Sequence, residues 1–144
     1  MQIFLPYKNP FDVAKCLDIR RLNKQIIECR QILAAIDGRS KAWSHHPVAL
    51  MYAHHRDFVE NYLYCLESYQ AGDISTAEVF GCVALGFLPS FVTEDFLIQH
   101  RRRLYTKDMS FYKEFAVYGE SLENWYIVDG KILKYKEGKL QFNK

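Results

Sequence analysis

The sequence predicts a mainly α-helical fold, a compact single-domain helical bundle that ends in a short β meander. Three observations favour it. Apolar residues recur at helical spacing over most of residues 10–105. From about residue 121 onwards apolar and polar residues alternate instead, with turn signals between the runs. The length of 144 residues suits one domain, and no repeat or linker divides it. We therefore expect one domain over residues 1–144, with residues 121–144 as a β-rich C-terminal extension.

Two long helices are expected in the first half of the chain. The first covers residues 10–36 and is ended by Gly38, because glycine commonly follows the last turn of a helix. The second covers residues 47–70, with Pro47 at a favoured first-turn position and Gly72 beyond its end.

Shorter elements are expected in the second half. Residues 74–88 are apolar enough to lie centrally, although two internal glycines weaken the helical pattern. A helix is expected over residues 93–105, and another short helix around residues 111–113. Beyond them, Asp129-Gly130 and Glu137-Gly138 are turn signals that separate two or three short strands.

The composition is that of an ordinary globular protein. Hydrophobic residues make up 49% and charged residues 25% of the chain, which excludes a disordered protein. No apolar run approaches the roughly 18 residues of a membrane span, and the N-terminus lacks the features of a signal peptide. We therefore expect a cytoplasmic protein without membrane contact. The four cysteines form no CxxC pair and are expected to be reduced and mostly buried.

Basic and acidic residues are unevenly distributed. Residues 1–46 hold eight Lys and Arg against four Asp and Glu, whereas residues 47–91 hold one against five. Residues 92–144 hold ten against eight, including the run Arg101-Arg102-Arg103. A net charge of +2 does not by itself indicate nucleic acid, but the two local basic clusters leave a polyanionic ligand open.

The first predicted helix carries a polar stripe beside its apolar face. At about 100° per residue, Asp18, Arg21, Gln25 and Glu28 fall close together along it. Side chains at the edge of a core are partly desolvated, and charges there are costly unless they are paired. The stripe is either an ion-pair ladder that ties this helix to another, or an active-site wall that aims a carboxylate, a cation and an amide into one cleft. Periodicity alone does not separate the two.

Five segments, taken in order, resemble a known family. They are "FLPY", "CLDIRRLNKQIIE..QIL", "W..HP", "FLIQHRRRLYTKD" and "FYKEF", and they span residues 3–115. Their order resembles the pyrimidine-dimer DNA glycosylase and endonuclease V-like family, in particular its small phage and bacterial branch. The resemblance implies a compact endonuclease V-like helical domain that repairs DNA by base excision. Such an enzyme flips a nucleotide out of the duplex, cuts its glycosidic bond through a Schiff base and nicks the strand by β-elimination.

The resemblance also implies partners and location. It implies a monomer that binds double-stranded DNA and needs neither a cofactor nor a metal. The enzyme would act in the cytoplasm, that of the host if a phage encodes it, and at the nucleoid when bound to DNA.

The polar stripe suits this chemistry. Glu28 is the expected carboxylate that stabilises the positive charge developing at C1′ of the sugar and moves protons. Arg21 is expected to clamp a phosphate with two hydrogen bonds, and Gln25 to present its amide to the same cleft. His46, in the "HP" segment, is expected to cap the second helix and to approach the stripe.

The nucleophile is expected to be an amine. In the founding enzyme of the family it belongs to a small second residue, exposed when the initiator methionine is removed. Here the second residue is Gln2, which is too bulky for the usual removal, so the candidates are the α-amine of Met1 and the side chain of Lys24. An α-amine, with an ordinary pKa of about 7.7–8.0, is unprotonated far more often than lysine at about 10.4. Lys24 is also expected to point away from the stripe, which favours Met1.

Basic, aromatic and neighbouring polar residues are expected to contact the DNA. They are Asp18, Arg20, Trp43, His45, Arg101, Arg102, Arg103, Lys107 and Tyr112. Basic side chains would bind phosphates, and an aromatic side chain would fill the gap that a flipped nucleotide leaves. Tyr7 and Phe111 are further candidates for that filler, although all of these aromatic residues also suit a core.

Two other functions remain open. His54 or His55 could face the same way as Asp57, with His46 joining them, which would give a metal-dependent nuclease or hydrolase. Alternatively the protein is a non-catalytic module that binds DNA or another protein, which would follow if Glu28 were held in a saturated ion pair.

Overall fold

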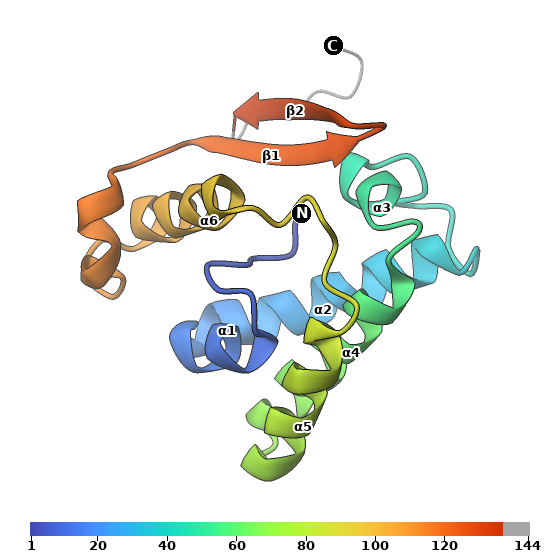
Figure 1. Ribbon diagram of the computed structural model, residues 1–144, viewed down its shortest axis with the longest axis horizontal. Coiled ribbons are helices and arrows are strands. Elements are labelled where there is room, and N and C mark those ends of the chain that lie inside the picture. Colours follow the sequence, from blue (N-terminus) through green and yellow to red (C-terminus); the bar gives the residue numbers. More distant parts are fainter. Residues whose placement is uncertain (137–144) are drawn as a thin grey trace.

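The computed structural model describes residues 1–136, and it confirms the predicted fold class (Figure 1). Helices dominate, and a two-stranded antiparallel hairpin closes the described chain. The elements, in order, are α1 (Pro10–Cys16), α2 (Ile19–Ile36), α3 (Pro47–Met51), α4 (Arg56–Gln70), α5 (Ile74–Leu85), α6 (Glu94–Lys107), the 3₁₀ helix η1 (Lys113–Tyr118), β1 (Glu123–Val128) and β2 (Lys131–Lys136).

The prediction of one continuous helix over residues 10–36 is wrong, because the chain breaks between α1 and α2. Leu17 and Asp18 adopt extended backbone conformations, with ψ angles of 139° and 156°. The Asp18 backbone N–H donates to the hydroxyl of Tyr112 at 3.0 Å, and the same hydroxyl donates to the Asp18 carboxylate. No glycine or proline marks this break. A contact with a residue more than ninety positions away therefore ends one helix and starts the next.

The predicted helix over residues 47–70 is also two helices, α3 and α4. Pro47 occupies the first turn of α3 as predicted, and the side chain of His46 caps it by accepting the N–H of Val48 at 3.0 Å. Between the two helices the buried ring of Tyr52 packs edge-on against Phe91, with their centroids 5.4 Å apart. The turn at residues 52–55 thus follows from aromatic packing.

Glycine residues follow the last turns of α2 and α4, as predicted. Another glycine, within α5, allows that helix to pack closely against α1. Gly38 and Gly72, just beyond α2 and α4, have φ angles of 73° and 84°, which favour glycine. Within α5, a Cβ at Gly81 would lie 2.5 Å from Oδ1 of Asn9 and 2.9 Å from Cβ of Phe11. A glycine there lets α5 approach the start of α1 closely.

The C-terminal strands form where alternation predicted them. β1 pairs with β2 from Glu123–Lys136 to Val128–Lys131, which leaves a two-residue turn. Asp129 and Gly130 have φ angles of 52° and 75°, as the predicted Asp-Gly turn requires. The second turn signal, Glu137-Gly138, lies outside the described residues.

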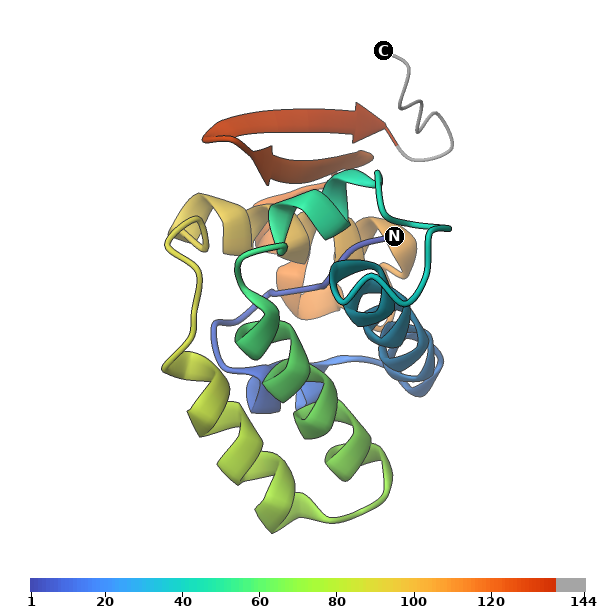
Figure 2. The same ribbon diagram turned by 90° about the vertical axis from the view of Figure 1, so that its right-hand side faces the viewer.

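The elements surround an extended N-terminal segment, residues 1–6. The hairpin lies over α6 and α3 at one end of the molecule, and α4 and α5 run antiparallel at the other (Figures 1 and 2). The N-terminal segment starts beneath the hairpin and runs down to α1 (Figure 1). Ile3 and Leu5 are only 1% and 0% exposed, so this segment is part of the core.

Side chains supply the hydrogen bonds of this buried segment. It pairs with neither strand of the hairpin, and buried backbone groups are costly when they lack partners. The side-chain amide of Gln25, on α2, accepts the N–H of Phe4 and donates to the carbonyl of Gln2, both at 2.8 Å. Nδ1 of His100, on α6, accepts the N–H of Leu5 at 2.7 Å.

Hydroxyl and guanidinium groups complete this set of contacts. The hydroxyl of Tyr62, on α4, donates to the carbonyl of Phe4 at 2.6 Å. The hydroxyl of Tyr126, on β1, donates to the carbonyl of Met1 at 2.8 Å. Nε of Arg101 donates to the carbonyl of Pro6 at 2.8 Å. Four elements that are far apart in sequence therefore meet on one short segment.

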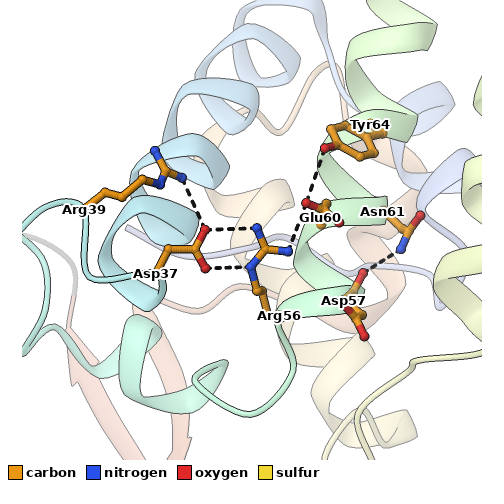
Figure 3. A network of polar contacts seen from close by, with 7 residues as sticks. All are labelled: Asp37, Arg39, Arg56, Asp57, Glu60, Asn61 and Tyr64. Atoms are coloured by element: carbon orange, nitrogen blue, oxygen red, sulfur yellow. Dashed lines mark hydrogen bonds and ion pairs between the residues drawn. The ribbon is translucent and has the colours of Figure 1, made fainter.

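A surface network fastens α2 to α4 (Figure 3). Arg56, at the start of α4, donates two hydrogen bonds to the carboxylate of Asp37, at 2.6 and 3.0 Å. It also donates to Glu60 at 3.0 Å, and Arg39 approaches Asp37 from the other side at 3.4 Å. These pairs are partly exposed, so each contributes modestly to stability.

Within residues 1–136, no helix has both the length and the apolar character that crossing a membrane requires.

We predict that Gln25→Leu destabilises the protein by about 2–5 kcal/mol. The leucine keeps the shape of the side chain approximately but leaves the Phe4 N–H and the Gln2 carbonyl buried without partners. Urea unfolding measures the change in the free energy of unfolding. Gln70→Leu is the matched control, because Gln70 is exposed and pairs with exposed Asn23, so it should change stability by less than about 0.5 kcal/mol. Equal effects of the two substitutions would contradict the role assigned to Gln25.

Candidate active site

A cavity of about 210 Å³ opens beside the N-terminal segment, and we call it the α2 cavity. It is lined by the N-terminal segment, one face of α2, the end of α6 and the start of β1. The lining residues are Met1, Gln2, Phe4, Arg20, Arg21, Lys24, Gln25, Glu28, Arg103, Lys107 and Asn124. Among the described residues, five cationic side chains and one carboxylate line it, so this part of its wall suits an anionic ligand.

The α2 cavity brings together most of the residues predicted to be catalytic. Met1, Arg21, Gln25 and Glu28 line it, and so does Lys24, which was expected to point away from the stripe. Three predicted DNA contacts also line it, namely Arg20, Arg103 and Lys107. The other predicted residues lie outside its lining; they are Asp18, Trp43, His45, His46, Arg101, Arg102 and Tyr112.

The polar stripe of α2 has two parts: residues whose side chains are paired within the protein, and Glu28, whose side chain is not paired among the described residues. Arg21 donates to the Asp18 carboxylate at 3.2 Å and to the backbone carbonyl of Lys107 at 3.4 Å. Burial alone would raise the pKa of Asp18, but the hydrogen bonds from Tyr112 and Arg21 outweigh it and lower that pKa. The first turn of the stripe is thus a paired cluster that fixes the guanidinium at the cavity wall.

Glu28 is the residue of the stripe whose carboxylate is unpaired among the described residues. Its side chain is half-buried, and among residues 1–136 no hydrogen bond or ion pair engages its carboxylate. Its charge still acts on its neighbours. Burial raises the pKa of Tyr126 and the pKa of Cys29, and the Glu28 carboxylate raises both further. Glu28 therefore acts electrostatically on the tyrosine that binds the carbonyl of Met1, and it remains available to a ligand in the cavity.

The N-terminal residue lines the same cavity as this carboxylate. The Met1 carbonyl accepts the hydroxyl hydrogen of Tyr126. The ring of His46 lies edge-on between Tyr126 and Trp43, with centroid distances of 5.5 and 5.6 Å. Burial lowers the pKa of His46 to about 4, and the positive charge of the N-terminal amine lowers it as well. The imidazole is thus neutral at neutral pH and lies within electrostatic reach of the α-amine.

The Arg101–Arg103 run is built into the fold. Arg103 is fully buried and donates to the side chain of Asn124 and to the carbonyl of Ser121, both at 2.9 Å. Arg102 donates to the carbonyl of Tyr118 at 2.7 Å, and Arg101 to the Pro6 carbonyl. Each of these side chains therefore connects α6 to a neighbouring segment of backbone. This structural role holds whether or not the side chain also contacts DNA.

The aromatic candidates differ in how accessible they are. Tyr112 is fully buried, and Tyr7 and Trp43 are half-buried. Phe111 is 51% exposed and packs edge-on against Tyr112, with centroids 4.9 Å apart. Because Tyr112 binds Asp18, Phe111 sits on the same cluster that fixes Arg21.

Four residues of this region were not predicted from the sequence: Gln2, Phe4, Asn124 and Tyr126. The Gln2 side chain donates to Oδ1 of Asn124 at 2.7 Å, and that oxygen also accepts Nε of Arg103. Alternation in β1 places Asn124 and Tyr126 on its inner face, but nothing in the local sequence shows what they face.

The histidines of the metal hypothesis do not form a ligand set. His54, His55 and Asp57 line a second cavity of about 290 Å³, whereas His46 caps α3 beside the N-terminus. In the described part of the chain, no group of three or more His, Cys, Asp or Glu side chains could hold a metal ion.

Comparison with known families identifies the N-terminal part of the chain. The family model described as pyrimidine dimer DNA glycosylase matches residues 1–69. Over these residues the chain is similar to the pyrimidine dimer DNA glycosylase family. The match confirms the resemblance drawn from the sequence, and it includes Met1, Arg21, Gln25 and Glu28. The family name implies a DNA glycosylase of DNA repair, with DNA as its substrate. The chain matches neither a curated protein nor a solved structure.

We predict that the double variant Arg20→Ala/Lys24→Ala binds undamaged duplex DNA more weakly. Both side chains are exposed and line the cavity, so each loss removes one potential phosphate contact without disturbing the core. The slope of log K against log salt concentration should become less negative by up to about 1.8. Fluorescence anisotropy over a salt series measures both effects.

Lys15→Ala is the control for this experiment, because Lys15 is an exposed residue of α1 outside the cavity lining. It should leave affinity and slope close to those of the wild type. Unchanged binding by the double variant would show that DNA does not contact this face of α2.

Proposed function

We propose that this protein is a DNA glycosylase with apurinic/apyrimidinic lyase activity that acts on double-stranded DNA as a monomer. One observation carries the proposal: Glu28, a half-buried carboxylate without a partner in the described chain, shares a cationic cavity with the N-terminal residue. A half-buried carboxylate that no described group engages is available to a ligand in the cavity, so the arrangement favours a catalytic role.

The α-amine of Met1 is the proposed nucleophile. Its nitrogen attacks C1′ of a flipped nucleotide, and the glycosidic bond breaks with its electron pair leaving on the base, which takes up a proton. Opening of the sugar ring at the C1′–O4′ bond then gives the Schiff base. Loss of a proton from C2′ expels the 3′ phosphate, which nicks the strand, and water finally hydrolyses the Schiff base.

Residues of α2 would assist these steps. The negative charge of Glu28 would stabilise the positive charge that develops at C1′, and its oxygens would move protons to and from the ring oxygen and C2′. Arg21 would bind a phosphate next to the flipped nucleotide, since Asp18 and the Lys107 carbonyl already hold it in place. Gln25 would act indirectly, because both polar atoms of its amide hold the N-terminal segment.

Three substrate classes fit this mechanism: ultraviolet photoproducts, abasic sites and modified bases. All contain a C1′ that an amine can attack. A screen of duplexes that carry one lesion each would distinguish them, with release of the base and nicking of the strand as separate readouts.

We predict that Glu28→Gln abolishes turnover and leaves the melting temperature close to that of the wild type. Glutamine is nearly isosteric but carries no charge and accepts no proton at neutral pH, while no contact of the fold is lost. Strand nicking on an abasic duplex and thermal melting measure the two properties. Glu67→Gln is the matched control, since Glu67 pairs with Arg30 away from the cavity and should keep full activity. A stability loss with activity retained would instead favour the ion-pair ladder.

We predict that borohydride traps a covalent complex with an abasic duplex, attached at the α-amine of Met1. Lys24→Ala should still be trapped, because the proposed bond forms at the α-amine of Met1 and not at this exposed side chain. Mass spectrometry of the crosslinked peptide, on protein whose intact mass confirms Met1 as the first residue, locates the bond. Attachment at Lys24 would contradict the assignment, and absence of any crosslink from active enzyme would contradict the lyase mechanism.

A further inference from the structure

Tyr112 is a buried residue whose hydroxyl group binds the start of the polar stripe. The residue is 0% exposed, and its ring stacks on that of Phe115, with the centroids 6.2 Å apart and the ring planes 4° from parallel. The hydroxyl accepts the backbone N–H of Asp18 at 3.0 Å and donates to Oδ1 of the same residue. Packing fixes the ring and two hydrogen bonds fix the hydroxyl, so Tyr112 can act on a DNA ligand only through its neighbours.

Asp18 connects Tyr112 to Arg21. The carboxylate oxygen that accepts the Tyr112 hydroxyl also accepts Nη1 of Arg21 at 3.2 Å. On its other side, Nη2 of Arg21 donates to the carbonyl of Lys107, the last residue of α6, at 3.4 Å. The guanidinium carbon lies 6.0 Å from the centroid of the Tyr112 ring. The guanidinium group is therefore bound from two directions, and one of these contacts depends on where Tyr112 holds Asp18.

The contacts of Arg21 leave hydrogen-bond donors for a ligand. A guanidinium group has five N–H donors in a planar fork. The two contacts use one donor on each terminal nitrogen, so among residues 1–136 no side chain or carbonyl binds Nε–H or the second N–H of either terminal nitrogen. The Arg21 side chain is 21% exposed and lines the α2 cavity. Its remaining donors suit a phosphate, which a guanidinium group binds with two hydrogen bonds.

The Tyr112 hydroxyl also limits how strongly Asp18 competes with a phosphate for Arg21. A carboxylate and a phosphate both attract the guanidinium group. Because Oδ1 is shared with a phenol, its contact with Nη1 is 3.2 Å long, whereas an unshared pair of this kind is usually about 2.7–2.9 Å. Without the hydroxyl, Asp18 could turn and bind the guanidinium group more closely, which would reorient the donors that face the cavity.

We propose that Tyr112 is a positioning residue that orients the guanidinium group of Arg21 toward a phosphate of duplex DNA through its hydrogen bond to Asp18. The proposal rests on the function proposed above, in which Arg21 binds a phosphate next to the flipped nucleotide. It gives Tyr112 an indirect part in DNA binding. The hydroxyl that separates α1 from α2 then also prepares the first turn of α2 for its ligand.

A double-mutant cycle in DNA binding tests whether Tyr112 acts through Arg21. The proteins are the wild type, Tyr112→Phe, Arg21→Ala and the double variant. Phenylalanine keeps the ring and its stack on Phe115 and removes only the hydroxyl. The ligand is a duplex that carries one tetrahydrofuran residue, an abasic-site analogue that forms no Schiff base. Fluorescence anisotropy measures Kd, and thermal melting shows whether each variant is folded.

Tyr69→Phe is the matched control. It removes the hydroxyl of a half-buried tyrosine on α4 that packs edge-on against Phe11, and Tyr69 lies outside the lining of the α2 cavity. This substitution should change neither Kd nor the kinetics of nicking.

We expect Arg21→Ala to raise Kd about tenfold or more, because it removes a charged hydrogen-bond donor. Tyr112→Phe should raise Kd by about three- to tenfold in the wild-type background and by less than about twofold in the Arg21→Ala background. On an abasic duplex that is nicked, Tyr112→Phe should raise KM by the same factor as Kd and leave kcat within about twofold, since the lost contact is made before and during the reaction.

The outcomes separate this proposal from the proposed function. If Tyr112→Phe leaves Kd unchanged, or raises it equally with and without Arg21, the positioning role is overturned even if the protein nicks DNA. If Arg21→Ala leaves Kd unchanged, Arg21 binds no phosphate and the positioning role is overturned with it, whereas glycosylase activity can still be observed. If the cycle shows the expected coupling but the wild type neither releases a base nor nicks, the positioning role stands and the catalytic function fails.

A second variant keeps the test decisive if Tyr112→Phe does not fold. Asp18→Asn then takes its place in the cycle, because its amide oxygen still accepts the Tyr112 hydroxyl but binds Arg21 without a charge. A change in Kd that disappears in the Arg21→Ala background supports the connection from Tyr112 through Asp18 to Arg21. A change of equal size in both backgrounds, or no change in either, overturns it.

Discussion

The arrangement of the described molecule depends on the burial of an extended N-terminal segment that pairs with no strand among residues 1–136. Its backbone groups must still be hydrogen-bonded, and side chains of Gln25, Tyr62, His100 and Tyr126 provide the partners. These residues come from α2, α4, α6 and β1, so satisfying one short stretch of backbone fixes the positions of four elements. The same contacts hold the N-terminal amine at the wall of a cavity.

This constraint explains why α2 carries a polar stripe beside its apolar face. The stripe meets different surroundings at each turn. Asp18 and Arg21 are held by Tyr112 and the end of α6, and Gln25 is occupied by the N-terminal segment. Only Glu28 faces the cavity without a partner among the described residues. The two interpretations of the stripe, a set of structural contacts and an active-site wall, thus apply to successive turns of the same helix.

The partners of each cationic side chain likewise decide whether it stabilises the fold or remains exposed at the cavity. The Arg101–Arg103 run looks like a binding surface in the sequence. In the fold its guanidinium groups bind the backbone carbonyls of Pro6, Tyr118 and Ser121. Arg20 and Lys24, which stand out less in the sequence, remain exposed at the cavity. A guanidinium group has five donors in a rigid fork, which suits it to such buried bridging positions.

The sequence by itself determined the fold class, the Asp-Gly hairpin turn, the caps at His46 and Gly38, the family resemblance and the stripe that contains Glu28. These features depend on local periodicity, backbone preferences or the order of motifs. Only the tertiary structure decided where α1 ends, since Tyr112 supplies that break from a distant part of the chain. Only the tertiary structure showed that Gln25 and Arg103 form hydrogen bonds that stabilise the fold. It also showed that Tyr126, on β1, binds the carbonyl of Met1. Such roles depend on the partners of a side chain, and residues far apart in the chain become partners only when it folds.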